Sequence, residues 1–391
     1  MNYQFSKEQQ QFRQEVKGFL ERELPPDWMI GQLHADEELE SDEEWAFSLS
    51  LRRKMAEKGW LSWWWPKEYG GQGRSRTEYT ILREEIGYYG APGFDNIGLA
   101  MVAPTLIFHG TEEQKRKHLL PLARGETTWC EGFSEPNAGS DLASLTTRAV
   151  EDGDDFVVDG QKAWTTAGHH ADWGIFLFRT DPNAPKHRGI SMFLVDLKTP
   201  GISRTPVHNL LGFPGWCDIF FDEVKVPREN MVGNQNQGWY VATTTLNNER
   251  TGITWVGACR RSLDRLIKYV KEKEPLTNNP IVRHKLASLA IEIELCRLVC
   301  YQIAWLQDRG ITPVHEASMA KNFANDMSLH VAEAGIQILG LYGQLGRDSK
   351  WAPFAGAVQR TFLSFPSWTL ATGSPEIQKN IIATMGLGLP R

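Results

Sequence analysis

The sequence has no long apolar run. None of the hydrophobic stretches in its 391 residues approaches the ~20 residues that a membrane-spanning helix needs. Its net charge is −6, with a pI near 6.0, so it lacks the basic face typical of a nucleic-acid-binding protein. The first residues show neither the apolar core of a signal peptide nor the composition of a transit peptide. We therefore expect no membrane span, no nucleic-acid partner and a cytoplasmic location.

Cysteine is scarce. The 5 cysteines are odd in number and form no Cys-x-x-Cys pair, which favours reduced, buried thiols in a reducing compartment. His169, His170 and Asp172 lie close together, but no further ligand follows at a spacing typical of a metal site. No Gly-x-Gly-x-x-Gly follows a predicted strand, and no Gly-x-Ser-x-Gly is present. The sequence thus favours neither a Rossmann nucleotide fold nor a serine nucleophile.

Apolar periodicity instead predicts three consecutive domains. Ser6 begins a helix as an N-cap, with Gln9 three residues later. We expect further helices at about 42–58, 76–90, 99–109 and 112–120, the last closed by Pro121. Short alternating strands follow, and helices return at about 240–273, 281–308, 313–339, 355–365 and from 375. The predicted fold class is α+β: an N-terminal helical domain (1–126), a middle β-barrel or sandwich (127–232) and a C-terminal four-helix-bundle domain (233–391).

Two segments of the predicted β domain carry candidate binding groups. The first is Trp129-Cys-Glu-Gly-Phe-Ser-Glu-Pro-Asn-Ala-Gly-Ser-Asp141, whose small residues permit a close backbone approach. The second, Gly160-Gln-Lys-Ala-Trp-Thr-Thr166, places Trp164 and Thr166 at i and i+2, on one face of a strand. An indole and hydroxyls around one space would suit a flat, hydrogen-bonding heterocycle. A β-hairpin whose tryptophan simply belongs to the core is the alternative.

These two segments resemble the β-domain signatures of the acyl-CoA dehydrogenase family, and the likeness extends over nearly the whole chain. The resemblance implies a FAD cofactor, an acyl-CoA substrate, an electron-transfer flavoprotein as electron acceptor, and a homotetramer or an α2β2 heterotetramer. It also implies the residues that contact the cofactor. In the β domain these are Phe133, Ser134, Ser140 (which would also meet acyl-CoA), Trp164 and Thr166, and in the helical part Gln337, Gly340, Ser374 and Glu376.

The catalytic base is the point at which this chain departs from many family members. Their glutamate belongs to a C-terminal Glu-Gly-Thr motif, but here Thr372 occupies its position, and threonine cannot serve as the base. Glu249 matches the mid-chain position from which isovaleryl- and long-chain-type members deliver their glutamate. We predict that Glu249 is the base, whereas a surface ion pair is its ordinary alternative. The same likeness assigns Asn247 and Arg250 to the pantetheine of CoA.

The segment that clamps the FAD pyrophosphate in relatives is also degenerate. Lys273-Glu-Pro-Leu276 stands in place of Arg-x-x-Phe-Gly, so either Lys273 or Arg283 would supply the cation. This resembles a bacterial subgroup that acts on bulky acyl-CoAs, steroid side chains included, in which two different chains assemble in some members. The expected reaction is α,β-dehydrogenation to a 2-enoyl-CoA, as in β-oxidation. A flavin oxidase or monooxygenase on the same scaffold, and a non-catalytic partner subunit, are the alternatives.

Overall fold

The computed structural model describes residues 4–26, 28, 39, 41–249 and 252–390, with the backbone alone at 244 and 247–249. The chain forms two compact units, and each draws on separate parts of the sequence. One, here called the β unit, contains residues 36–73 and 93–249. The other, the helical unit, contains 1–35, 74–92 and 250–391. The N-terminal third of the sequence therefore contributes to both units.

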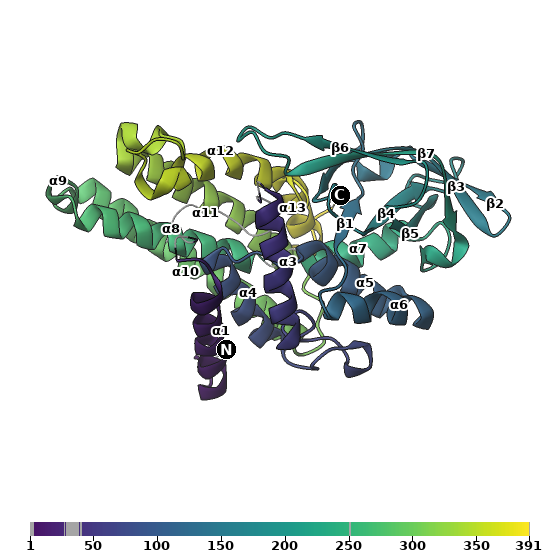
Figure 1. Ribbon diagram of the computed structural model, residues 1–391, viewed down its shortest axis with the longest axis horizontal. Coiled ribbons are helices and arrows are strands. Elements are labelled where there is room, and N and C mark those ends of the chain that lie inside the picture. Colours follow the sequence, from purple (N-terminus) through teal and green to yellow (C-terminus); the bar gives the residue numbers. More distant parts are fainter. Residues whose placement is uncertain (1–3, 27, 29–38, 40, 250–251, 391) are drawn as a thin grey trace. The chain divides into compact units, whose positions relative to one another are not determined.

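The β unit contains an eight-stranded sheet in the order β6-β7-β3-β2-β4-β5-β8, with β1 paired to β4 (Figure 1). Most neighbours are antiparallel, whereas β1 and β2 pair with β4 in parallel. The strands are β1 (Trp129–Gly132), β2 (Arg148–Asp152), β3 (Asp155–Thr166), β4 (Trp173–Arg179), β5 (Ile190–Asp196), β6 (Ile202–Val207), β7 (Trp216–Pro227) and β8 (Met231–Val232).

Aromatic side chains fill the core beside this sheet. Phe156, Phe176, Phe178, Phe193 and Phe221 are each at most 4% exposed, and their rings meet at centroid distances of 5.0–5.8 Å. Such pairs add to the stabilisation that comes from burying the rings. Every residue of β4 between its two ends is buried, as is every residue of β5 except Asp196, which explains why both strands are mostly apolar in the sequence.

The helices of the β unit include a segment of unusual geometry. The unit contains α3 (Asp42–Glu57), a π-helix at Ile97–Val102, α5 (Ala103–His109), α6 (Glu112–Ala123) and α7 (Gly238–Glu249). The predicted helix at 99–109 is thus α-helical only from residue 103, because the preceding residues are wound as a π-helix. Short π-helical segments are rare and frequently lie at functional sites. Residues 97–102 lie against β1, α5 and α7.

The helical unit is built around long helices that run alongside one another (Figure 1). Gly87 and Gly257 let α4 and α8 cross closely, because a Cβ on either would collide with the backbone of the other helix. The helices are α1 (Lys7–Glu23), α4 (Arg76–Tyr89), α8 (Ile253–Lys271), α9 (Glu274–Thr277), α10 (Pro280–Gln307), α11 (His315–Leu339), α12 (Ala357–Leu370) and α13 (Pro375–Ile381). Within the described parts of the chain, no helix has the length and apolarity needed to cross a membrane.

Most predicted helices are confirmed to within a few residues, but three further predictions differ from the structure. The helix expected at 240–273 is two helices, and Gly252, with φ +68°, caps the second one. Pro121 does not end α6, which continues to Ala123, and α12 continues past Pro366 to Leu370. Proline disturbs a helix by losing one hydrogen bond and crowding the preceding turn. Pro121 and Pro366 lie near the last turn of these two helices, and the chain remains helical beyond them.

Candidate functional site

The first predicted segment forms a tight turn after β1. Glu135 and Ala138 exchange two backbone hydrogen bonds, of 3.1 and 3.0 Å. Phe133 is buried, Ser134 is half-buried, and Ser140 is exposed at the far side of the turn. A Cβ added at Gly139 would meet no atom within 4 Å, so the space beside the turn is open. The segment therefore presents one hydroxyl near the sheet and one at the surface.

The second segment contains a β-bulge that changes the predicted orientation of its side chains. The register of β3 against β7 shifts between Lys162 and Thr165, and Trp164 has φ +60°. Regular alternation, from which the shared face of Trp164 and Thr166 was expected, is therefore interrupted at Trp164, because a residue with positive φ is not extended. Exposed Trp164 and half-buried Thr166 nevertheless flank the buried Thr165. Trp164 is 59% exposed, and its indole meets that of Trp216 edge-on, with ring centroids 5.8 Å apart. The alternative of a core tryptophan is thereby excluded.

Hydrogen bonds join the two segments. The N–H of Ala163, beside Trp164, donates to the carbonyl of Ser134 at 2.9 Å. Lys162 Nζ donates to the carbonyl of Phe133 at 3.2 Å and to Glu135 Oε1 at 2.8 Å. The structure thus places the Phe133–Ser134 backbone against the Trp164 bulge. Ser140 lies further along the same loop.

The sequence reasoning assigned no role to Lys162 or Glu135, although a signal for their pairing was present. Phe156, Val158 and Lys162 occupy alternate positions of β3, and all three are buried. A lysine on the inward face of a strand requires a buried carboxylate partner, because an unpaired charge in the core is strongly unfavourable. The adjoining segment offers three candidates, Glu131, Glu135 and Asp141, and the structure pairs Lys162 with Glu135.

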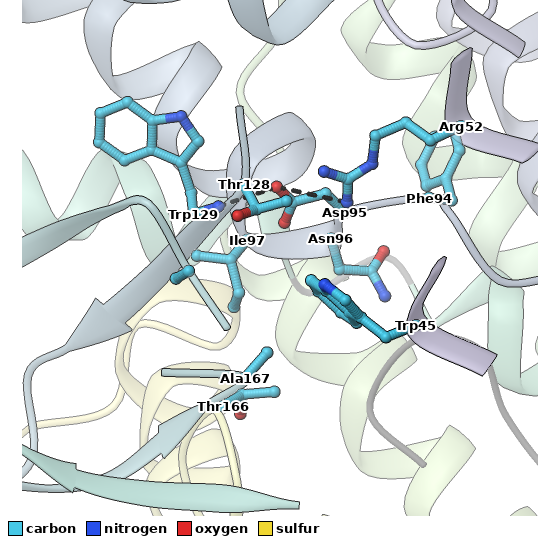
Figure 2. Close-up of a pocket in the computed structure, with 11 residues that line it drawn as sticks. Trp45, Arg52, Phe94, Asp95, Asn96, Ile97, Thr128, Trp129, Thr166 and Ala167 are labelled. Carbon is cyan, nitrogen blue, oxygen red and sulfur yellow. Dashed lines mark hydrogen bonds and ion pairs between the residues drawn. The ribbon is translucent and has the colours of Figure 1, made fainter. Parts of the chain in front are cut away.

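A small cavity of about 30 Å³ lies beside Thr166 and Ala167, with Asp95 on the opposite wall (Figure 2). Asp95 accepts hydrogen bonds from the N–H of Gly98 at 2.8 Å and of Trp129 at 3.1 Å, and Arg52 lies 3.7 Å from it. These contacts give Asp95 a structural role at the start of the π-helix. The cavity has room for little more than a water molecule, so it cannot hold a ring system by itself.

The predicted cofactor residues of the helical unit lie at two helix ends. Near the end of α11, Gln337 contacts Lys285 and donates to Glu333 at 2.9 Å. Both of these partners line a groove of about 540 Å³ along α10 and α11. Gly340, exposed and with φ +59°, follows directly. At the groove, Gln337 is thus already engaged by side chains of its own chain.

Ser374 and Glu376 lie at the start of α13. Ser374 caps this helix by accepting a hydrogen bond from the N–H of Ile377 at 3.5 Å. Glu376, in the first turn, has a lowered pKa because its own backbone N–H and Ser374 hydrogen-bond its carboxylate. Just before them, Thr372 has φ +59°, a conformation that is unusual for a β-branched residue. The buried Gln378 donates to the carbonyl of Thr372 at 2.9 Å, which holds this strained turn.

The predicted base and its neighbours lie at the limit of the described chain. The backbone of Glu249 ends α7, while the side chains of Asn247 and Glu249, and all of Arg250, lie outside the described residues. Lys273 and Arg283, the two candidates for the pyrophosphate cation, are both exposed. The Lys273 ammonium lies 5.8 Å from the centre of the Tyr269 ring. The roles of all five residues remain predictions.

Comparison with known proteins identifies the family. The models of the acyl-CoA dehydrogenase N-terminal, middle and C-terminal domains match residues 6–126, 130–224 and 236–387. The chain belongs to the acyl-CoA dehydrogenase family. A relative, acyl-CoA dehydrogenase FadE26 of Mycobacterium tuberculosis, is 37% identical over 86% of this chain and 87% of its own. The chain is accordingly an oxidoreductase that acts on an acyl-CoA, in a family that depends on FAD.

Two solved structures resemble this chain along its whole length, and in each comparison 100% of both chains is covered. The steroid ACAD Tcur3481-Tcur3483 is 32% identical, with a TM-score of 0.89. The ChsE4-ChsE5 complex from Mycobacterium tuberculosis is 32% identical, with a TM-score of 0.87. The predicted family and fold class are thereby confirmed: N-terminal helical, middle sheet and C-terminal helical domains.

Proposed function

We propose that this chain catalyses the FAD-dependent α,β-dehydrogenation of an acyl-CoA to a 2-enoyl-CoA, with Glu249 as the base. The observation that carries the proposal is the exposed Trp164, fixed off the sheet by a bulge beside the Ser134 backbone. Folding normally buries most of an indole, so an indole held outward in a strained conformation fits a flat ring that covers it. The residues of the β unit thus fit the flavin that the family requires.

In this proposal, Phe133, Ser134, Trp164 and Thr166 would hold the ring of FAD, and Ser140 would meet its phosphates and the acyl-CoA. Gln337, Gly340, Ser374 and Glu376 would complete the cofactor site. When bound, FAD supplies a hydride acceptor at N5 for the hydrogen of the β carbon. The chain itself supplies the proton acceptor: the Glu249 carboxylate takes the proton from the α carbon as the C–H bond breaks. The α carbon and β carbon then share the new double bond.

A base in this position must be a carboxylate whose pKa is suited to accepting a proton near neutral pH. Thr372 has no such group, so the proposal requires a carboxylate from elsewhere in the chain. Glu249, at the end of α7, satisfies this requirement by sequence position. Asn247 and Arg250 would contact the pantetheine, and their binding energy would orient the thioester for proton removal.

For the substrate, we propose a bulky acyl-CoA such as a steroid side-chain thioester, as the name of the steroid ACAD relative supports. For the electron acceptor, we propose an electron-transfer flavoprotein, as the family resemblance implies. The engagement of Gln337 by Lys285 and Glu333, with the degenerate clamp at Lys273, favours an α2β2 heterotetramer over a homotetramer. In such an assembly a second, different chain would complete the contacts to the FAD phosphates.

The test is an anaerobic titration of the purified protein with a panel of straight-chain, branched and steroid side-chain acyl-CoAs, followed by flavin absorbance. The wild type is expected to be bleached by at least one of them. Glu249→Gln should retain FAD and ligand while flavin reduction slows by a factor on the order of 10³ or more, since only the proton acceptor is lost. Glu229→Gln, which changes an exposed carboxylate of the β unit, is the matched control.

Equal reduction rates for Glu249→Gln and the wild type would refute the role of Glu249. Fast reoxidation of the bleached enzyme in air would favour an oxidase or monooxygenase. A colourless and inactive preparation would favour a non-catalytic partner subunit, and FAD binding after addition of a second chain would identify the heteromer.

A further inference from the structure

The Lys162–Glu135 ion pair lies beneath the backbone that the proposed function assigns to the flavin. The side chain of Lys162 is 0% exposed and that of Glu135 is 6% exposed. Lys162 Nζ lies 2.8 Å from Glu135 Oε1, and it also donates to the Phe133 carbonyl. One ammonium therefore contacts both ends of the Phe133–Glu135 segment and belongs to the strand that carries the Trp164 bulge.

Glu135 extends these connections to a third segment. Its Oε2 accepts from the N–H and hydroxyl of Thr146, at 2.7 and 3.0 Å, and its Oε1 accepts from the N–H of Thr147 at 2.9 Å. The carboxylate therefore closes the whole loop from Glu135 to Thr147, which includes Ser140. Arg179 holds the same loop from the sheet by donating to the carbonyls of Ala143 at 2.6 Å and Leu145 at 3.2 Å.

The electrostatics of the pair follow from its burial. Burial by itself raises the pKa of Glu135, but the facing Lys162 ammonium and the hydrogen bonds outweigh it and lower that pKa to about 2. Burial lowers the pKa of Lys162 to about 8, although Glu135 opposes the change. At neutral pH both groups are therefore charged.

Stability alone does not account for such a pair. Removing two charges from water is unfavourable, and neutral or apolar residues of similar volume commonly replace a buried ion pair without loss of stability. Here such a replacement would lose the hydrogen bond that orients the Phe133 backbone, because an apolar side chain in place of Lys162 has no donor for the Phe133 carbonyl. The pair differs in this respect from the exposed Lys225–Asp152 pair of the same sheet, at 3.3 Å, which touches no part of the loop in the contacts that the structure describes.

We propose that Lys162 and Glu135 are positioning residues that hold the Phe133–Ser134 backbone and the Trp164 bulge in the conformation that receives the flavin. The proposal rests on the proposed function for the identity of the ligand. The pair itself touches neither cofactor nor substrate. It acts by fixing the segments that do, in the way that groups supporting a binding residue determine its geometry.

The experiment compares two double variants that each remove one ion pair. Lys162→Met with Glu135→Gln leaves no unpaired charge in the core, and Lys225→Met with Asp152→Asn is the matched surface control. For each full-length protein we would measure the urea midpoint, the dissociation constant for FAD after removal of the flavin, and amide exchange over residues 133–147 and 163–166. The buried double variant should keep a urea midpoint close to that of the wild type.

The same variant should bind FAD at least about tenfold more weakly and exchange those amides faster, while the surface control should match the wild type in all three measurements. A buried double variant that binds FAD as the wild type does would overturn the proposal. So would a variant that fails to fold, because the pair would then be required for stability. If the wild type binds no FAD, the proposed function fails, and faster amide exchange in the variant would still support the positioning role.

Discussion

Glu135 in the β unit and Glu84 in the helical unit are both buried carboxylates that pair with cations, yet their surroundings differ in kind. Glu135 meets one buried lysine and the backbone N–H groups of Thr146 and Thr147. Glu84 meets Arg13 at 2.6 Å, Arg260 and Arg297 at 2.8 Å each, and the hydroxyl of Tyr301 at 2.6 Å. The Glu135 carboxylate thus holds the backbone of a loop in place, while the Glu84 carboxylate joins side chains from separate helices.

The helices that Glu84 joins explain this difference. Arg13 belongs to α1, Glu84 to α4, Arg260 to α8, and Arg297 with Tyr301 to α10. Removing Glu84 would take away the one anion that all three guanidinium groups share, and leave Arg13 and Arg260 paired with Glu85, and Arg297 with Glu294. Removing the Lys162–Glu135 pair together takes away the cation with its anion. The comparison teaches that a buried carboxylate stabilises the fold where its cations come from different elements, and orients a site where its partners are the backbone of a loop.

The largest effect on stability is therefore expected at Glu84. Glu84→Gln removes the charge that the arginines share, and we expect the free energy of unfolding to fall by about 3 kcal/mol, the lower end for breaking a buried pair, since the arginines are partly exposed. Urea unfolding at neutral pH measures the change. Folded Glu84→Gln should retain the FAD affinity of the wild type. A loss of FAD affinity without a loss of stability would show that Glu84, and not only Glu135, serves the cofactor site.

Glu85, next to Glu84, is expected to have the opposite pH dependence. Burial raises its pKa above the ordinary value of 4.5, although Arg260 and Arg13 oppose the change, and among the described residues no donor hydrogen-bonds either of its oxygens. The pKa of Glu84 is lowered, because Arg13 and Arg297 outweigh the effect of its burial. The charge of Glu84 therefore stabilises the fold above pH 4.5, and this contribution disappears as the pH falls through the folded-state pKa.

For Glu85 the folded state binds the proton more tightly than the unfolded state does. Between its folded-state pKa and pH 4.5, its contribution therefore makes the protein more stable as the pH falls. Glu85→Gln should remove this slope and raise the free energy of unfolding at pH 7, by less than Glu84→Gln lowers it. Urea midpoints of both variants between pH 4.5 and 8 provide the measurement. A fall in stability at pH 7 would show that the charge of Glu85 contributes to the cluster as that of Glu84 does.

The sequence predicted the domain order and most helices because apolar periodicity and caps are local signals. The capping box of Ser6 with Gln9 is one example. The division into two helices at Gly252 escaped prediction, because periodicity continues on both sides of the break. The π-helix at Ile97–Val102 differs from an α-helix in its hydrogen bonding. The pattern of its apolar residues does not distinguish the two kinds of helix.

The site was predictable as a set of segments but not as a geometry. The resemblance implied that Phe133–Ser134 and Trp164–Thr166 belong to one site, and the bonds from Ala163 and Lys162 bring these segments together. The bulge at Trp164 was not predictable, since it arises from pairing with β7 rather than from the local sequence. The engagement of Gln337 by Lys285 likewise depends on the packing of α10 against α11.

The smallest effect on stability is expected at the exposed Trp164, near the end of β3 in the β unit. Trp164→Gly removes the strain of a left-handed backbone, which amounts to about 1–2 kcal/mol for a residue other than glycine. Glycine loses more conformational freedom on folding, by about 0.5–1 kcal/mol, and the contact with Trp216 is lost. The free energy of unfolding, measured by urea denaturation, should therefore change by no more than about 1 kcal/mol. The affinity for FAD should fall.

Phe156→Ala, in the same strand, provides the contrast. Phe156 is 0% exposed, and loss of a buried phenylalanine typically destabilises by about 3–5 kcal/mol. If Trp164→Gly lowered the free energy of unfolding by a comparable amount, Trp164 would be part of the packing that holds β3 against β7. Its exposure would then not be explained by a ligand that covers it. If it lost little stability and also kept the wild-type FAD affinity, the bulge would serve neither the fold nor the flavin. Only unchanged stability with weakened FAD binding agrees with a strained residue that the fold retains for its ligand.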